Sequence, residues 1–346
     1  MINYAFWKNK KVLITGHTGF KGSWLGVFLK NLDSQIYGIS REDKKGLYQM
    51  ANLKNIYEDE LFFDLSSKDI ASNFQQIEKI NPDIVFHFAA QSLVYQGYKN
   101  PLDTLNSNII GTFNVLNEIS KCPNTKSVVV STTDKVYKNS DFDNVEESPL
   151  GGKDFYSSSK VGQENVIEAF SRLDYQLKLS VVRSGNVIGG GDRAEKRLAT
   201  DLIESLIANK NFILRKPKSI RPWQHVFDSI YGYLLVAQEN YLDEKSEIYN
   251  LNSEINNNYD AEYLSKKFIE LWDSKISIEI EENEEFKEVD KLIINSSKAK
   301  DKLGWKPILS IDEMINETVL WEKQYLNDTS PDFSLNQASN YLNNLN

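Results

Sequence analysis

The amino-acid sequence predicts an α/β protein with a doubly wound parallel sheet and a smaller C-terminal lobe. Apolar, β-branched runs alternate with longer amphipathic stretches through the first half of the 346-residue chain, and this alternation breaks after Gly185. Strands that are apolar along their whole length are typical of a parallel sheet covered by helices on both faces. Regular alternation of strands and helices winds such a sheet in both directions.

The expected elements follow one another at short intervals. We predict strands at residues 12–15, 35–39, 61–64, 84–89, 127–131 and 179–183. Amphipathic spacing predicts helices that begin near Lys21, that end near Ile80, and that span about 102–120 and 157–173. Beyond Gly185 we expect a helix around 198–208, short strands, and a last helix that ends near Tyr325.

The order of these elements indicates two parts. Residues 1–185 form the predicted dinucleotide-binding Rossmann domain. Residues 186–326 form mainly a substrate-binding lobe laid over the carboxyl ends of the strands, while a segment near 223–250 returns to the first domain. Ligands of doubly wound sheets bind at those carboxyl ends. The remaining tail, 327–346, is rich in Asn and Ser, and we expect it to be loosely ordered.

Composition limits the classes of function. A net charge of −9 and a pI near 5.1 argue against a nucleic-acid partner, because duplex binding needs a basic face. The single cysteine, Cys122, cannot form an intramolecular disulfide, and apolar runs fall short of the ~20 residues that span a bilayer. We therefore expect a cytoplasmic protein without a membrane or nucleic-acid partner. His17, His87 and His225 are scattered, so we predict no metal site.

A glycine-rich loop separates the first strand from the first helix. Gly16, Gly19 and Gly22 recur at a spacing of three, where small residues let the backbone approach a pyrophosphate and the amino end of the helix attracts its charge. This position predicts a dinucleotide site. Asp64, at the end of the third strand, is placed to meet the adenine, although an acid there can equally cap the next helix.

The end of the second strand leaves the form of the nicotinamide cofactor open. Arg41 favours the additional phosphate of NADP. Glu42 or Asp43 instead favours NAD, because an acid at this place accepts hydrogen bonds from the ribose.

Tyr156 and Lys160 form a Tyr-x-x-x-Lys pattern at the start of a predicted helix. The spacing alone is uninformative, because the chain has the same pattern at four other places. The position is informative, since this helix follows the strand end at 131–135. A phenol with a pKa near 10 needs a neighbouring cation to act as a base at neutral pH, and Lys160 with an oxidised nicotinamide supplies one.

Thr133, Asp134 and Lys135 follow the fifth predicted strand. An adjacent acid and amine provide proton transfers that a simple dehydrogenase does not require, and they predict the removal of water next to an oxidised carbon. The alternative interpretation is a solvated pair of charges at a strand end. The carboxyl ends of the strands favour a functional pair, because ligands bind there.

With these motifs assembled, the chain resembles the extended short-chain dehydrogenase/reductases, and within them most closely the CDP-glucose 4,6-dehydratases. The similarity extends from Phe6 to about Trp321 and is carried by the segments 16–24, 89–94, 133–135, 150–152, 185–192, 221–226 and 303–305. Related dehydratases acting on dTDP-glucose or GDP-mannose typically have a glutamate in place of Lys135. Tyr95 and Arg193 depart from the family pattern, which has an arginine and an aromatic residue there, and this leaves nucleotide and sugar specificity open.

The resemblance implies conversion of CDP-glucose to CDP-4-keto-6-deoxyglucose with a recycled NAD. Tyr156 would take the proton of the C4 hydroxyl that Thr133 orients. Lys135 would remove the C5 proton, and Asp134 would protonate the departing C6 hydroxyl. A homodimer or homotetramer built on two helices per subunit is also implied.

The same resemblance assigns the remaining site residues. The expected catalytic residues are Thr133, Asp134, Lys135, Tyr156 and Lys160. The expected cofactor contacts are Gly16, Gly19, Phe20, Lys21, Gly22, Asp64, Leu65, Ala89, Ala90, Tyr156 and Lys160. The expected substrate contacts are Gln91, Asn186, Arg193, Arg197, Arg221 and His225.

Three alternative functions stay open. The first is the same dehydration of another nucleotide sugar, which the residues at positions 95 and 193 allow. The second is a nucleotide-sugar C4 epimerase, which needs Tyr156 and Lys160 but not the Asp134 and Lys135 pair. The third is a non-catalytic, cofactor-sensing protein.

Overall fold

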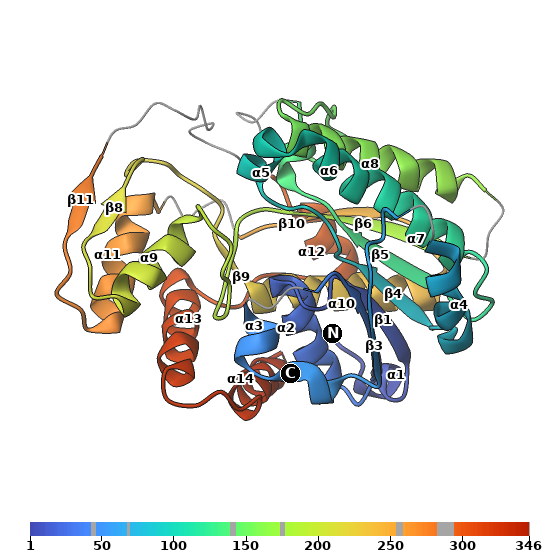
Figure 1. The fold of residues 1–346 in the computed structure, drawn as a ribbon, viewed down its shortest axis with the longest axis horizontal. Coiled ribbons are helices and arrows are strands. Elements are labelled where there is room, and N and C mark those ends of the chain that lie inside the picture. Colours follow the sequence, from blue (N-terminus) through green and yellow to red (C-terminus); the bar gives the residue numbers. More distant parts are fainter. Residues whose placement is uncertain are drawn as a thin grey trace.

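A seven-stranded sheet forms the centre of the larger domain (Figure 1). The computed structural model describes residues 1–42, 46–67, 70–138, 143–173, 177–253, 259–281 and 294–345. The strands of the sheet are β1 (Lys11–Thr15), β2 (Gln35–Ser40), β3 (Asp59–Phe62), β4 (Ile84–His87), β5 (Ser127–Ser131), β6 (Lys178–Ser184) and β10 (Ile248–Leu251). Their order is β10-β6-β5-β4-β1-β2-β3, and every neighbouring pair is parallel. The predicted doubly wound Rossmann sheet is confirmed.

The strand order reverses on either side of β1. Thr15 at its carboxyl end is paired with Ile39 of β2 on one side and with His87 of β4 on the other. The connections that follow β1 and β4 leave the sheet in opposite directions, and a crevice for ligands opens between them. The glycine-rich loop therefore begins at the switch point of the sheet.

Two hydrophobic cores lie on opposite faces of this sheet, because successive side chains of a strand point to opposite faces. One face packs against α2 (Phe20–Asn31), α10 (Val226–Asp243) and α14 (Asp332–Asn343). The other face packs against α4 (Ile70–Ile80), α7 (Gly111–Ile119) and α8 (Phe155–Ser171). Figure 1 shows the two helical layers above and below the strands.

The region 102–120, predicted as one helix, is divided into three pieces. Helix α6 (Pro101–Leu105) leads into a π-helical turn, η2 (Asn106–Ile110), and the chain continues as α7. The turn directs the buried side chain of Asn108 inward, where its Nδ2 donates to Ser159 Oγ of α8 at 2.8 Å. Hydrophobic periodicity does not report such a turn, because only one residue is added to the helix.

The smaller lobe has a core of its own. It comprises α9 (Leu198–Ile207), β8 (Phe212–Leu214), α11 (Ala261–Trp272), β11 (Ile278–Ile280) and α13 (Ile311–Tyr325). A short parallel pair, β7 (Val187–Ile188) and β9 (Gln224–His225), joins it to the larger domain. The chain then returns through α10, which packs on β5 and β6, and β10 completes the sheet.

The C-terminal tail differs from the expected loose order. Residues Asp332–Asn343 form α14, and its side chains Ala338, Tyr341 and Leu342 are buried against the larger domain. The Tyr341 hydroxyl donates to Asp228 Oδ1 of α10 at 2.7 Å. Apolar residues three or four positions apart give this segment one buried face, and burial outweighs the weak helix propensity of Asn and Ser.

Short elements complete the structure. They are α1 (Tyr4–Trp7), α3 (Leu47–Met50), η1 (Leu53–Ile56), α5 (Val94–Lys99), η3 (Asp134–Val136) and α12 (Ser297–Leu303). Within the described ranges, none of the helices combines the length and apolar character that crossing a bilayer requires.

Candidate active site

A cavity of about 1550 Å³ lies between the carboxyl ends of the strands and the smaller lobe. Most of the predicted site residues line it, although they come from segments far apart in the chain. They are Gly16, Gly19, Phe20, Lys21, Gly22, Asp64, Leu65, Ala89, Ala90, Gln91, Thr133, Asp134, Lys135, Tyr156, Lys160, Asn186, Arg193, Arg197 and Arg221. His225 is absent from the lining.

The glycine-rich loop is packed too closely for larger residues. Gly16 has a φ of +75°, and a Cβ atom there would lie 2.7 Å from the backbone nitrogen of Ala89. A Cβ atom on Gly22 would overlap the carbonyl oxygen of Gly16. Gly19 precedes α2 without a side-chain cap, so the first backbone N–H groups of the helix are left for a ligand. This loop fits the pyrophosphate of a dinucleotide.

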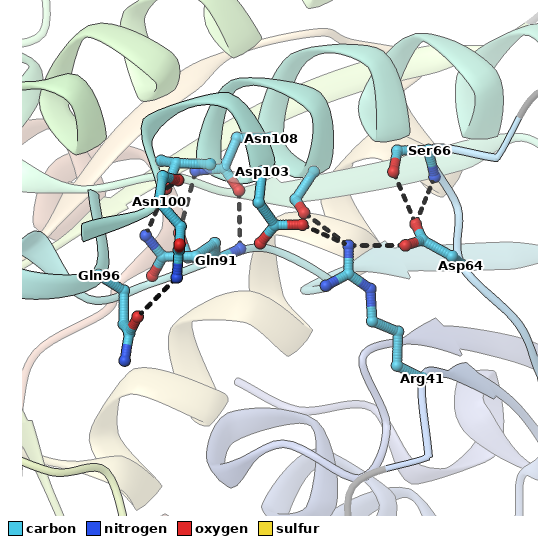
Figure 2. Close-up of polar contacts among 10 residues, drawn as sticks. Arg41, Asp64, Ser66, Gln91, Gln96, Asn100, Asp103 and Asn108 are labelled. Carbon is cyan, nitrogen blue, oxygen red and sulfur yellow. Dashed lines mark hydrogen bonds and ion pairs between the residues drawn. The ribbon is translucent and has the colours of Figure 1, made fainter. Parts of the chain in front are cut away.

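Arg41 occupies the end of the cavity beyond β2 (Figure 2). Its Nη2 lies 2.9 Å from Asp64 Oδ2, 3.5 Å from Asp103 Oδ1 and 2.7 Å from Ser107 Oγ. Asp64 Oδ1 also accepts from the backbone nitrogen of Ser66 at 2.8 Å, so the turn after β3 is held by the same carboxylate. Asp43 lies outside the described residues.

Tyr156 and Lys160 face the cavity from the first turns of α8. Asp154 caps this helix by accepting from the backbone nitrogen of Ser157 at 2.9 Å. Burial raises the pKa of Tyr156 to about 12, although a hydrogen bond with Thr133 opposes the rise. The phenol therefore needs an additional cation in order to act as a base near neutral pH.

Lys160 is held by hydrogen bonds to neutral groups. Its Nζ donates to the carbonyl oxygen of Ser131 at 3.1 Å and to Gln163 Oε1 at 2.9 Å. Burial and the nearby ammonium of Lys21 lower the pKa of Lys160 to about 7. Sequence reasoning missed Gln163, although its spacing of three residues from Lys160 places both on one helix face.

The turn η3 brings Thr133, Asp134 and Lys135 into the cavity wall beside the start of α8. Thr133 Oγ1 caps the turn by accepting from the backbone nitrogen of Lys135 at 3.3 Å, and it donates to Asp134 Oδ1 at 3.0 Å. Asp134 is 1% exposed, and its Oδ2 has no hydrogen-bond partner among the described residues. Lys135 Nζ lies 4.0 Å from Asp134 Oδ1. The acid is thus buried in the cavity wall, which distinguishes it from a solvated surface charge.

Two of the arginines predicted to contact the substrate form ion pairs within the protein. Arg193 donates through both terminal nitrogens to the buried Glu322 of α13, and this ion pair holds the loop after β7 against the lobe. Arg197 is paired with Asp192 at 2.9 Å and stays partly exposed. Three guanidinium groups of the cavity, those of Arg41, Arg193 and Arg197, are therefore paired with protein carboxylates.

Gln91 lines the cavity with its amide hydrogen-bonded to the protein, whereas His225 is buried away from the lining. The amide of Gln91 donates to Thr104 Oγ1 at 2.8 Å and to the carbonyl oxygen of Leu93 at 3.0 Å, and its oxygen accepts from the Leu93 backbone nitrogen. His225 is buried in the core, and its Nδ1 accepts from the backbone nitrogen of Phe227 at the start of α10. Burial lowers the pKa of His225 to about 3, so the ring is neutral. The expectation that His225 contacts substrate therefore differs from the structure.

Comparison with known proteins decides the family. Residues 13–318 match the family model described as GDP-mannose 4,6 dehydratase. The chain belongs to this family. It is 35% identical over 340 residues to the CDP-glucose 4,6-dehydratase of Salmonella typhimurium, with 94% of each chain covered. It is also 25% identical to the dTDP-glucose 4,6-dehydratase of Haemophilus influenzae, with 90% of this chain and 97% of the relative covered.

Solved structures agree with the family assignment at the level of the fold. The UDP-glucose 4-epimerase of Thermotoga maritima with UDP-glucose superposes with a TM-score of 0.77 at 23% identity, over 91% of this chain and 99% of the other. MoeE5 in complex with UDP-glucuronic acid and NAD has the same TM-score at 21% identity, with the same coverage. The resemblance to extended short-chain dehydrogenase/reductases is confirmed.

Proposed function

We propose that the protein converts CDP-glucose to CDP-4-keto-6-deoxyglucose and water with NAD as a recycled cofactor. The observation that carries this proposal is the buried Asp134, adjacent to Lys135 and facing Tyr156 in one cavity. The 35% identity to a CDP-glucose 4,6-dehydratase supports the choice of nucleotide sugar.

The residues that line the cavity support this choice of cofactor. The loop from Gly16 to Gly22 and the amino end of α2 would hold the pyrophosphate, and Asp64 and Leu65 would adjoin the adenosine. A nicotinamide held beside Tyr156 and Lys160 would supply a hydride acceptor for the oxidation and a hydride donor for the later reduction.

The residues of the chain would carry the proton transfers. Tyr156 takes the proton of the C4 hydroxyl, which Thr133 orients, and the C4 ketone makes the C5 hydrogen acidic. Lys135 removes the C5 proton. Asp134 protonates the C6 hydroxyl, which departs as water. These roles require a neutral amine and a protonated acid when the substrate is bound.

The contacts of Arg41 support NAD over NADP. Two carboxylates, Asp64 and Asp103, already lie beside its guanidinium. The phosphate of NADP would bring further negative charge next to those carboxylates. Titration of the cofactor-free protein with both dinucleotides tests this choice, and tighter binding of NADP would overturn it.

A homodimer or homotetramer would cover the exposed apolar residues of the layer that contains α5 to α8. Tyr98, Leu102, Ile110, Phe113 and Phe155 are each at least 44% exposed on these neighbouring helices. Contiguous exposed apolar groups mark interaction surfaces. We infer an oligomer from these exposed residues. We infer a cytoplasmic location because the only cysteine of the sequence, Cys122, is buried and unpaired. Light scattering would measure the assembly, and a monomer would contradict it.

A nucleotide-sugar C4 epimerase is the second candidate. It is favoured by the 24% identity to a UDP-glucose 4-epimerase of Mycoplasma genitalium, which extends over 92% of this chain. An epimerase has no use for the acid and amine of the turn η3. Incubation with the glucose derivatives of CDP, dTDP, GDP and UDP, followed by mass spectrometry, distinguishes these activities. Loss of water from CDP-glucose without net consumption of NAD supports the proposal.

Other outcomes of that incubation change the proposal in defined ways. Loss of water from another nucleotide sugar alone would keep the reaction and refute CDP-glucose. A product of unchanged mass would support the epimerase. Absence of any product, with cofactor bound, would support a cofactor-sensing protein.

A further inference from the structure

A buried ion pair lies behind the turn η3, outside the lining of the cavity. Glu164 is on α8, one helical turn beyond Lys160, and Arg183 is on β6. Arg183 Nη2 donates to Glu164 Oε2 at 2.6 Å, and its Nε lies 3.1 Å and 3.2 Å from the two carboxylate oxygens. The two side chains are 2% and 5% exposed.

The same pair contacts the chain on both sides of η3. Before the turn, Thr132 Oγ1 donates to Glu164 Oε1 at 2.7 Å. After the turn, Arg183 Nη1 donates to the Tyr137 hydroxyl at 2.9 Å, and the guanidinium lies 4.9 Å from the centre of the tyrosine ring. The ion pair therefore joins both ends of the segment that carries Asp134 and Lys135 to the helix that carries Tyr156.

The turn itself has little internal support. Its two backbone hydrogen bonds, from Val136 to Thr133 and from Tyr137 to Asp134, are both 3.4 Å long. Bonds of this length are weaker than the usual bonds of about 2.9 Å. Backbone bonds from Thr132 N to the Val182 carbonyl at 2.9 Å and from Gly151 N to the Val136 carbonyl at 2.8 Å also hold this segment. The side-chain contacts with Glu164 and Arg183 add the polar link between the segment and α8.

A buried ion pair is a poor source of stability, because the loss of hydration offsets much of its attraction. What the pair does impose is a fixed geometry between α8, β6 and both ends of η3. We propose that Glu164 and Arg183 are positioning residues that act through Thr132 and Tyr137. Their role is to keep the side chains of Asp134 and Lys135 at a fixed position relative to Tyr156. The catalytic consequence rests on the proposed function, whereas the structural consequence does not.

The structural consequence is measured without substrate. In Thr132→Val the side chain keeps its shape and loses its hydroxyl, so the backbone amides of residues 133–137 should exchange with deuterium faster than in the wild type. Amides of α8 should keep their wild-type exchange. Thr132→Ser retains a donor and should restore slow exchange. Unchanged exchange of residues 133–137 in Thr132→Val would overturn the proposal.

The catalytic consequence is a change in the balance of two half-reactions. Tyr156 and Lys160 are fixed by a long helix, so the oxidation of substrate should slow less than the elimination in Thr132→Val, although Thr133, which orients the C4 hydroxyl, adjoins the altered residue. The elimination should slow by at least about tenfold, since small misplacements of catalytic groups cost up to ~100-fold in rate. Reduced cofactor should then accumulate after mixing with substrate.

Two further variants distinguish the effect of losing a contact that positions the turn from the effect of losing any buried hydroxyl group. Tyr137→Phe removes the contact of Arg183 after the turn and should shift the balance in the same direction. Ser180→Ala removes a buried hydroxyl of β6 that bonds to Asn240 and not to the turn, so it should leave the balance unchanged. An equal fall of both half-reactions in Thr132→Val, or wild-type turnover, would contradict the proposal. If the wild type removes water from no nucleotide sugar, the proposed function fails and the exchange measurement alone decides.

Discussion

Tyr156 and Lys160 project from a helix of 17 residues, whereas Asp134 and Lys135 project from a turn of three. The helix is capped by Asp154 and packed along its length on the sheet, so its side chains are positioned by regular backbone. The turn depends on side chains from other elements. One active site therefore contains two halves with different sources of rigidity, and they serve different chemical steps.

The two halves also differ in charge. Near Tyr156 the cavity wall holds two buried ammonium groups, those of Lys21 and Lys160, and the carboxylate of Asp134 acts on Tyr156 and Lys21 from the side of η3. Near η3 a buried carboxylate lies beside Lys135. A half that collects cations suits the removal of a proton by a phenol, and a half with adjacent acid and amine suits elimination.

The largest effect is expected from Tyr156→Phe, which removes the proposed base on α8 and leaves Asp134 and Lys135 of η3 unchanged. Turnover should fall ~10²–10⁴-fold because the general base is lost, while the ring still packs. Steady-state rates and a cofactor titration measure both properties. Cofactor affinity should remain, and retention of more than about a tenth of the wild-type rate would refute the assignment of the base.

Asp134→Asn and Lys135→Ala each remove one of the two groups of η3 that are proposed to carry out the elimination. Oxidation of substrate requires neither residue, so these variants should form reduced cofactor and then stall before water is lost. Absorbance of the reduced nicotinamide after rapid mixing follows the first step, and mass spectrometry follows the second. Wild-type product formation in either variant would show that the pair does not carry out the elimination.

The cationic half should make the stability of the cofactor-free protein depend on pH. Burial lowers the pKa of Lys160 to about 7 and that of Lys21 to about 8, from an ordinary value of 10.5. Between about pH 7 and pH 10 the unfolded chain holds protons that the folded protein has released, so stability rises with pH in this window. Between these pH values the melting temperature of Lys160→Met should increase with pH by less than the melting temperature of the wild type does. Equal slopes for both proteins would exclude this origin.

The smallest effect is expected at the far end of the cavity, where the charges are exposed. Asp64 and Asp103 are about half-exposed beside Arg41, and such pairs contribute at most ~1 kcal/mol. Asp103→Asn should therefore improve the binding of NADP relative to NAD by about fivefold or less. Comparative titration measures the ratio. A ratio that moves towards NAD would contradict the electrostatic argument for cofactor choice.

Local patterns predicted the sheet well because they depend on neighbouring residues. Apolar runs such as 127–131 and 84–87 are fully or mostly buried strands, and the glycine-rich loop directly follows the strand Lys11–Thr15 as predicted. The same patterns missed α14, whose buried face is masked by its Asn and Ser content. They also missed the π-helical turn at Asn106–Ile110, because one added residue leaves the apolar spacing nearly unchanged.

The sequence by itself determined the parallel sheet, its ligand-binding edge and the two segments that meet there. Each of these follows from periodicity and from residue types that are adjacent in the chain. Only the tertiary structure decided which charges face the cavity. Arg193 pairs with Glu322 across 129 positions, and Arg183 pairs with Glu164 across 19. Such pairings depend on distances between packed elements, which the spacing of residues along a chain does not encode.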